Sequence, residues 1–230
     1  MSSPAFLKHW QQLRDFFSLG VIKLFITWFA ITPVVVKALH KLPDTIFIGE
    51  RSIPIQASLP FSWEVLWVSS FCFFISYITY HWKCPNFIKR YHDFASYKST
   101  NHSPRWIVWE LYYSYEDSGG EIMLAERLIA KNLANVIDDS SEIFDEPVVE
   151  GRGTIWRFLY NGKKYEVCMS SKEDITSERE LFWEIYARWA DSHPKPRTVT
   201  WLGLYAAIAL LAYVVVQNII SVVIYLFTAS

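Results

Sequence analysis

The apolar residues of this chain are concentrated in three long runs, at residues 16–36, 63–82 and 199–228. Within each run they are nearly continuous and do not recur at the spacing of an amphipathic helix or a half-buried strand. A helix needs about 20 apolar residues to cross the ~30 Å hydrocarbon core of a bilayer. The pattern therefore predicts an α-helical membrane protein with three transmembrane helices.

The first run contains one charged residue, Lys23, about two helical turns from its start. We interpret Lys23 as an interfacial residue whose long stem reaches back to the headgroups; a functional charge inside the membrane is the alternative. Pro33 is expected to kink or end this helix. A cleaved signal peptide is a competing interpretation, but the run is too long and no small-residue cleavage site follows it, so we expect an anchor.

The other two runs have clear limits. The second has Glu64 at one end, His81 and Lys83 at the other, and tryptophan or tyrosine at both borders, as is typical of side chains at headgroup level. The third has no charged residue and exceeds the thickness of the hydrocarbon core. We therefore expect the third helix to tilt or to extend beyond the bilayer.

Small and amide side chains in the third run indicate helix packing. Gly203 and Ala207 have the spacing of a small-xxx-small motif, and Gln217 and Asn218 are amides in an otherwise apolar helix. Small residues let helix backbones approach closely, and amides in lipid need hydrogen-bond partners. These four residues predict transmembrane packing, either as a homo-oligomer or against the other helices of the same chain.

Lysine and arginine are unevenly distributed around the three runs. They cluster before the first, after the second and before the third, whereas the loop after the first run has few and the C-terminal tail none. The positive-inside rule then places the amino terminus and the large polar segment in the cytoplasm, in what we expect to be a bacterial inner membrane. The expected organisation is an amino-terminal segment with transmembrane helix 1 (1–39), an extracytoplasmic loop (40–62), transmembrane helix 2 (63–83), a cytoplasmic domain (84–197), and transmembrane helix 3 with a short extracytoplasmic tail (198–230).

The polar segments contain shorter patterns of their own. In the outer loop, residues 45–57 alternate around Gly49-Glu50-Arg51, which predicts a small hairpin or extended flap. Residues 84–98 have aromatic and apolar residues at helical spacing and predict a juxtamembrane amphipathic helix. Residues 106–116 are rich in aromatics and fit either a strand or a buried helix.

The rest of the large segment predicts an α+β domain. Residues 118–121 have the spacing of a capping box, and apolar positions from Ile122 to Val136 predict a helix. Residues 154–169 alternate around Asn161-Gly162, which predicts a β-hairpin with a type I′ turn, and residues 148–150 predict a strand beside it. A second helix is expected at 174–191. The domain should be a β-hairpin or small antiparallel sheet packed by two helices.

The sequence contains no recognisable catalytic or cofactor-binding motif. It lacks G-x-S-x-G, and its three cysteines, Cys72, Cys84 and Cys168, are too far apart for a disulfide framework or a zinc motif. His81, Cys84 and His92 fit metal-ligand spacing only loosely. We expect no enzyme, no cofactor and no metal site.

Four basic residues in and beside the hairpin are the main candidates for ligand binding. Arg152, Arg157, Lys163 and Lys164 together suit an anionic ligand such as a nucleotide second messenger. The alternative is a solvated hairpin edge on which lysines discourage strand addition. A net charge of −1 gives no indication of a nucleic-acid partner.

These features favour a non-enzymatic membrane protein that presents its cytoplasmic domain to a protein partner, as a sensor or scaffold. Tryptophan and tyrosine, which are enriched at protein interfaces, are abundant in the domain. Exclusion, immunity and anti-phage defence components often have this layout, which is an analogy of layout alone. The alternative is an oligomeric pore or transport subunit built around the third helix, with Lys23, Gln217 and Asn218 lining a polar path.

Overall fold

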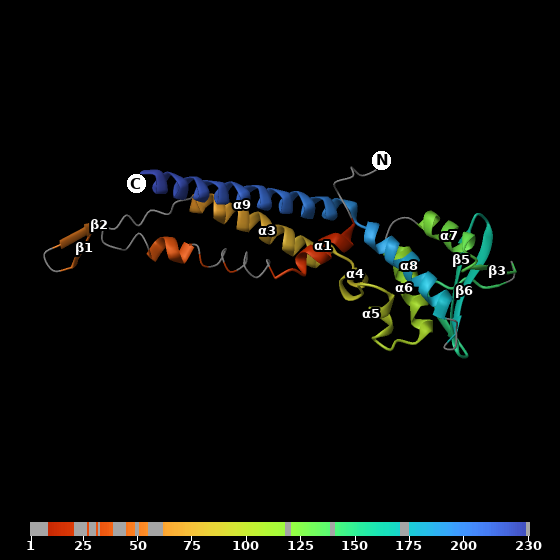
Figure 1. The fold of residues 1–230 in the computed structure, drawn as a ribbon. Coiled ribbons are helices and arrows are strands. Elements are labelled where there is room, and N and C mark those ends of the chain that lie inside the picture. Colours follow the sequence, from red (N-terminus) through yellow and green to blue (C-terminus); the bar gives the residue numbers. More distant parts are fainter. Residues whose placement is uncertain are drawn as a thin grey trace. The chain divides into compact units, whose positions relative to one another are not determined.

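The computed structural model of the 230-residue chain describes residues 9–20, 27, 31, 33–38, 45–48, 51–54, 62–117, 121–138, 141–170 and 175–228 (Figure 1). The chain forms two compact units. The first contains residues 15–83 and 195–230, and the second contains residues 8–14 and 84–194. The domain predicted from the polar segment therefore also includes a piece of the amino terminus.

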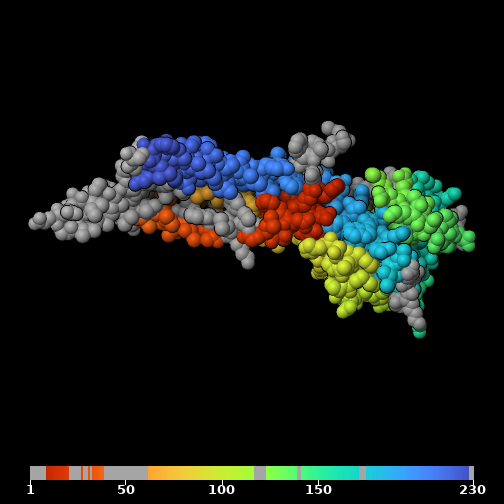
Figure 2. Space-filling model, in the orientation of Figure 1, coloured from red at the N-terminus to blue at the C-terminus, as the bar shows by residue number. Residues whose placement is uncertain are grey.

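Two long helices, α3 and α9, dominate the first unit. Helix α3 comprises Trp63–Lys83 and helix α9 comprises Pro194–Thr228, as predicted from the second and third apolar runs. Helix α9 begins with proline at its first position, where the missing N–H has no helical partner to lose. Within the described part of the chain, the stretch Pro194–Phe227 is the one helix long and apolar enough to cross a membrane, and only 11% of its most apolar window is buried. Its uncovered surface is the blue region of Figure 2.

The remaining parts of the first unit are short. Helix α1, Trp10–Phe17, ends in this unit, where Phe17 packs against Phe73 and Tyr80 of α3 with ring centroids 5.8 and 4.8 Å apart. Residues 33–38 are helical. Strands β1, Thr45–Ile48, and β2, Arg51–Pro54, pair antiparallel and confirm the predicted hairpin. Lys23 lies outside the described residues, and membrane crossing by residues 16–36 and 63–82 stays a prediction.

The second unit contains a four-stranded antiparallel sheet in the order β3-β6-β5-β4. The predicted hairpin is confirmed: β5, Gly153–Tyr160, pairs with β6, Lys163–Ser170, and Asn161 and Gly162 have φ of +48° and +73°, as a type I′ turn requires. Strand β4, Val148–Glu150, pairs with β5 as predicted. The fourth strand, β3, Asn135–Val136, was not predicted and makes the sheet larger than expected.

The helices of this unit differ from the sequence prediction in three places. The predicted amphipathic helix at 84–98 is wrong: it is two short helices, α4, Asn86–Arg90, and α5, Phe94–Lys98, because Tyr91 is extended and Asp93 starts a new capping box with Ser96. Residues 107–117 form helix α6, which resolves the choice between strand and helix. Helix α7, Glu121–Ala130, ends earlier than predicted because Asn132 takes a positive φ and Leu133 N–H bonds to Leu128 O, so Val136 falls in β3.

Helix α8, Ile175–Asp191, organises the core of the second unit and agrees with the predicted helix at 174–191. It contacts α4, α5, α6 and α7, while α6 packs on the sheet. The face of the sheet toward α6 is aromatic, with the Trp156 ring 6.0 Å from that of Tyr112 and 4.9 Å from that of Tyr115. A short 3-10 helix, Pro104–Trp106, precedes α6.

The first turns of α1 are part of this core. Trp10 and Leu13 are fully buried, and the Trp10 indole donates to Ser192 O at 2.8 Å. The buried Arg14 guanidinium donates to Ile88 O and Tyr91 O, at 3.1 and 2.9 Å, and so satisfies carbonyls at the end of α4. The amino-terminal residues 9–14 are thus a structural element of the second unit and not only a positively charged flank of the first run.

Candidate functional site

The small residues of α9 pack against α3 of the same chain. A Cβ atom added at Gly203 would clash with Ser76 Oγ, so any larger residue here would force the Ser76 side chain to shift. Ala207 is fully buried, and its carbonyl accepts a hydrogen bond from Ser69 Oγ at 2.7 Å. Both Gly203 and Ala207 thus contact α3 of the same chain, which is one of the two uses predicted for them, while the homo-oligomer stays a prediction.

The two amides of α9 differ in their surroundings. Gln217 Oε1 accepts from Ser62 N–H at 3.2 Å, and its Nε2 donates to Tyr213 Oη at 3.0 Å. Both ends of that amide are therefore engaged inside the first unit. Asn218 is exposed on α9, so the structure does not bring these two predicted residues together at one site.

The four basic residues of the hairpin are also not brought together. Arg157 bonds Glu166 at 2.7 Å and lies over the Phe144 ring, and Lys164 donates to Ser141 O at 2.6 Å. Arg152 lies in the turn between β4 and β5, while Lys163 starts β6 at the opposite end of the hairpin. At about 3.4 Å per residue, the length of β5 separates these ends by more than 20 Å, so the four cations do not surround one ligand.

A groove in the second unit is a stronger candidate for binding. It has a volume of about 230 Å³ and lies between helices α7 and α8, beside the amino-terminal residue His9. Apolar side chains in its lining come from Met123, Leu124 and Ala187. The remaining lining residues are charged or titratable, and they are His9, Arg127, Glu184, Arg188 and Asp191.

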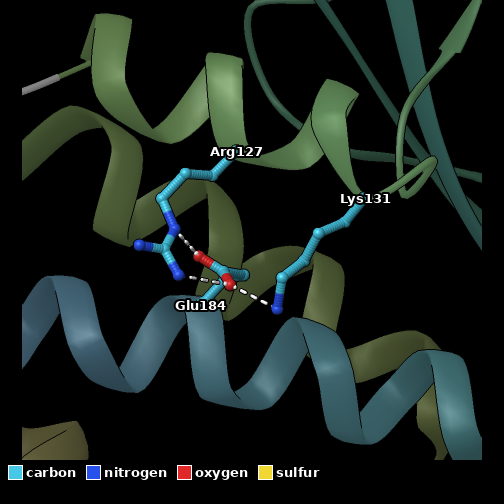
Figure 3. A network of polar contacts seen from close by, with 3 residues as sticks. All are labelled: Arg127, Lys131 and Glu184. Atoms are coloured by element: carbon cyan, nitrogen blue, oxygen red, sulfur yellow. Dashed lines mark hydrogen bonds and ion pairs between the residues drawn. The ribbon is translucent and has the colours of Figure 1, made fainter.

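An ion-pair network lies at one side of this groove, and we call it the wall: Arg127 and Glu184 line the groove, and Lys131 lies next to them (Figure 3). Arg127 donates to Glu184 through Nε at 2.5 Å and Nη2 at 2.9 Å, and Lys131 Nζ lies 2.7 Å from Glu184 Oε1. Lys131 directly follows α7, and its backbone N–H donates to Arg127 O at 3.1 Å. The two side chains are therefore four residues apart on one helical face, and both reach the same carboxylate on α8. The carboxylate fixes two cations that would otherwise repel each other.

Burial and the neighbouring positive charges shift the pKa of Glu184 in opposite directions. The Glu184 side chain is only 3% exposed. Burial alone would raise the pKa of Glu184, but the hydrogen bonds and charges of Arg127 and Lys131 outweigh it, so that the pKa lies below its ordinary value. The same hydrogen bond and charge raise the pKa of Arg127. Glu184 and Arg127 therefore stay ionised at neutral pH.

Arg127 and Lys131 can still bind a further anionic group. The side chains of Arg127 and Lys131 are 58% and 40% exposed, and among the described residues Arg127 Nη1 makes no hydrogen bond. Two cations share one carboxylate, so this network keeps one positive charge in excess, while the other two charged lining residues, Arg188 and Asp191, balance each other. The wall can bind an anionic group, but it holds no nucleophile paired with a base.

A second polar cluster is sealed inside the helical part of the unit. Glu178 is fully buried and accepts from Lys98 Nζ at 2.8 Å. Burial raises the pKa of Tyr97, and the charges of Glu178 and Glu110 add to that effect; burial also raises the pKa of Glu110. The hydroxyls of Tyr91 and Tyr97 have no hydrogen-bond partner among the described residues. Because Tyr91, Tyr97 and Glu178 are closed off from solvent, we interpret this cluster as structural.

His81, Cys84 and His92, which fit metal-ligand spacing loosely in the sequence, can be compared with the structure. In the described part of the chain, no group of three histidine, cysteine, aspartate or glutamate side chains is arranged to bind a metal ion. Of the three cysteines, Cys84 is buried, Cys72 is half-buried and Cys168 is exposed. Comparison with known proteins gives no match to a protein-family model, a curated protein or a solved structure.

The groove between α7 and α8 was not predicted from the sequence. Arg127 and Lys131 have the spacing of residues on one helical face, which is the available signal. Their shared partner, Glu184, is more than fifty residues away in the chain. Only the packing of α7 against α8 brings the three side chains together.

Proposed function

We propose that this protein is a non-enzymatic membrane protein that presents a soluble domain to a protein partner, as a sensor or scaffold. The observation that carries the proposal is that a long apolar helix with little buried surface, α9, joins directly to a well-packed α+β unit with an exposed, charged groove. The helix needs lipid to cover it. The groove offers binding groups and no paired nucleophile and base.

Three membrane spans are part of this proposal, with the soluble unit and the amino terminus on the cytoplasmic side. Helix α3 supports a second span because it is 21 residues long and packs along α9 through Gly203. Its serines and tyrosines make it less apolar than α9, but a packed neighbour can satisfy them within the membrane. The excess of lysine and arginine beside the soluble segment supports the orientation.

The pore alternative has less support. It needs amides that line a polar path, and Gln217 is engaged by Ser62 and Tyr213 at both ends. The small-residue face of α9, which an oligomer around this helix would use, is occupied by α3. Homo-oligomerisation through another face of α9, such as the one with Asn218, is compatible with the scaffold proposal.

The test is photocrosslinking of the tagged full-length protein in intact cells, with the reactive residue at exposed positions of the soluble unit. Met123 and Trp183 are suitable, because their exposed fractions are 64% and 44%. A stoichiometric crosslink to one cytoplasmic protein is the expected result. Ion leak that depends on Asn218, without any crosslinked partner, would refute the proposal and favour the pore.

A further inference from the structure

We infer that the groove between α7 and α8 binds a short segment of the partner protein that has one large apolar side chain flanked by carboxylates. This inference rests on the proposed function and specifies the chemistry of the partner. It combines the size of the groove, its apolar lining and the excess positive charge of its wall.

The size of the groove suits one side chain and not a cofactor. Its volume is about 230 Å³, whereas pockets for small-molecule ligands usually have about 300–1,000 Å³. Met123, Leu124 and Ala187 supply apolar surface, and Met123 is flexible and exposed. Methionine adapts its shape to the side chain that packs on it. The apolar lining also favours a peptide over a free phosphate, which would gain nothing from it.

The charge of the wall selects acidic flanks. Glu184 is already bonded by Arg127 and Lys131, so an added carboxylate meets a wall with one surplus positive charge. Arginine binds carboxylates through parallel N–H groups, and Arg127 has Nη1 available among the described contacts. A basic segment would be repelled at the same place.

The network also prepares Arg127 for binding. Two hydrogen bonds to Glu184 hold its guanidinium in one orientation before any partner arrives (Figure 3). A side chain that is already ordered loses less conformational entropy on binding. Glu184 is therefore a positioning residue for Arg127, and it does not itself contact the partner's carboxylate.

The experiment uses the full-length protein in lipid nanodiscs and two fluorescein-labelled peptides, Glu-Asp-Leu-Phe-Asp-Glu and Lys-Lys-Leu-Phe-Lys-Lys. Fluorescence anisotropy should show saturable binding of the acidic peptide, at least about tenfold tighter than that of the basic one. Met123→Asp places a negative charge in the groove and should weaken acidic-peptide binding by about tenfold. The matched control is Ile175→Asp, at a similarly exposed position that does not line the groove.

Three results would overturn the inference: equal affinity for the two peptides, no saturable binding of the acidic peptide, or equal effects of Met123→Asp and Ile175→Asp. Thermal unfolding of both variants confirms that they are folded. A partner crosslinked in cells through Trp183 and not through Met123 would retain the proposed function and refute the groove. Peptide binding at the groove without any cellular partner would refute the proposed function instead.

Discussion

Replacing Gly203 with alanine tests the packing of α9 against α3. The added Cβ would lie 2.2 Å from Ser76 Oγ, 3.4 Å from Cys72 O and 3.6 Å from Ser76 Cβ. Only the first distance is prohibitive, and Ser76 Oγ is held there by a 2.9 Å hydrogen bond to Cys72 O. The clash should cost about 1–3 kcal/mol as overpacking, against a gain of about 1 kcal/mol from the better helix propensity of alanine.

The coupling free energy between Gly203→Ala and Ser76→Ala tests this contact more specifically than either single change does. Ser76→Ala removes the clashing oxygen and leaves a Cβ–Cβ distance that is ordinary van der Waals contact. The double variant should therefore be more stable, by about 1–2 kcal/mol, than the sum of the two single changes predicts. Ala209→Leu, on an exposed position of α9, is the control for added volume without a clash.

Thermal unfolding in detergent micelles, followed by the fluorescence of the 11 tryptophans, measures these differences. Reversible unfolding of the variants under identical detergent conditions is required, so that the three free-energy differences can be compared. Strictly additive effects of Gly203→Ala and Ser76→Ala would refute the reasoning, because they would mean that the two side chains do not meet.

Three further variants probe the soluble unit. Arg14→Leu leaves two backbone carbonyls without their donor, so it should lower the free energy of unfolding by about 2–4 kcal/mol, measured by thermal unfolding. The control His9→Gln should change the free energy of unfolding little. Glu184 has a lowered pKa, so its ion pairs stabilise the fold above its ordinary pKa of 4.5, and this contribution is lost as pH falls through the folded-state pKa. Glu184→Gln should therefore cost about 1 kcal/mol at neutral pH and less in acid, and an equal cost at both would contradict this. Gly162→Val forces a branched side chain to φ +73° and should cost about 1–2 kcal/mol in urea unfolding, while Lys163→Val next to it should stay within about 0.5 kcal/mol.

Strong local signals in the sequence predicted the corresponding elements correctly. The type I′ hairpin follows from Asn161-Gly162, since these residues tolerate positive φ where most others do not. Helices α3, α8 and α9 follow from long apolar or periodic runs, and α3 and α8 end at the charged residues Lys83 and Asp191. In each case the deciding interactions lie within a few residues of one another.

The errors arose where tertiary contacts or a local cap override periodicity. Apolar spacing continues through Tyr91 and Leu133, yet Asp93 caps a new helix and Asn132 ends α7. Strand β3 has only two residues, and it exists because β6 offers a free edge. No pattern of so few residues can predict a strand.

The candidate site was the least predictable part. The four hairpin cations look like a patch in sequence, but Arg157 and Lys164 are engaged by neighbouring groups of the sheet and its loop. The groove depends on α7 and α8 packing side by side, and its key carboxylate, Glu184, comes from a distant helix. Charge spacing along one helix could suggest a binding face, but not the partner that fixes it.

Alkaline extraction of membranes from cells that produce the full-length chain tests whether α9 spans the bilayer. High pH releases peripheral proteins and leaves proteins with spanning helices in the bilayer. The protein should stay in the membrane pellet, because α9 is apolar and only 11% of its most apolar window is buried among the described residues. Recovery of folded, monomeric protein in the alkaline supernatant would contradict it.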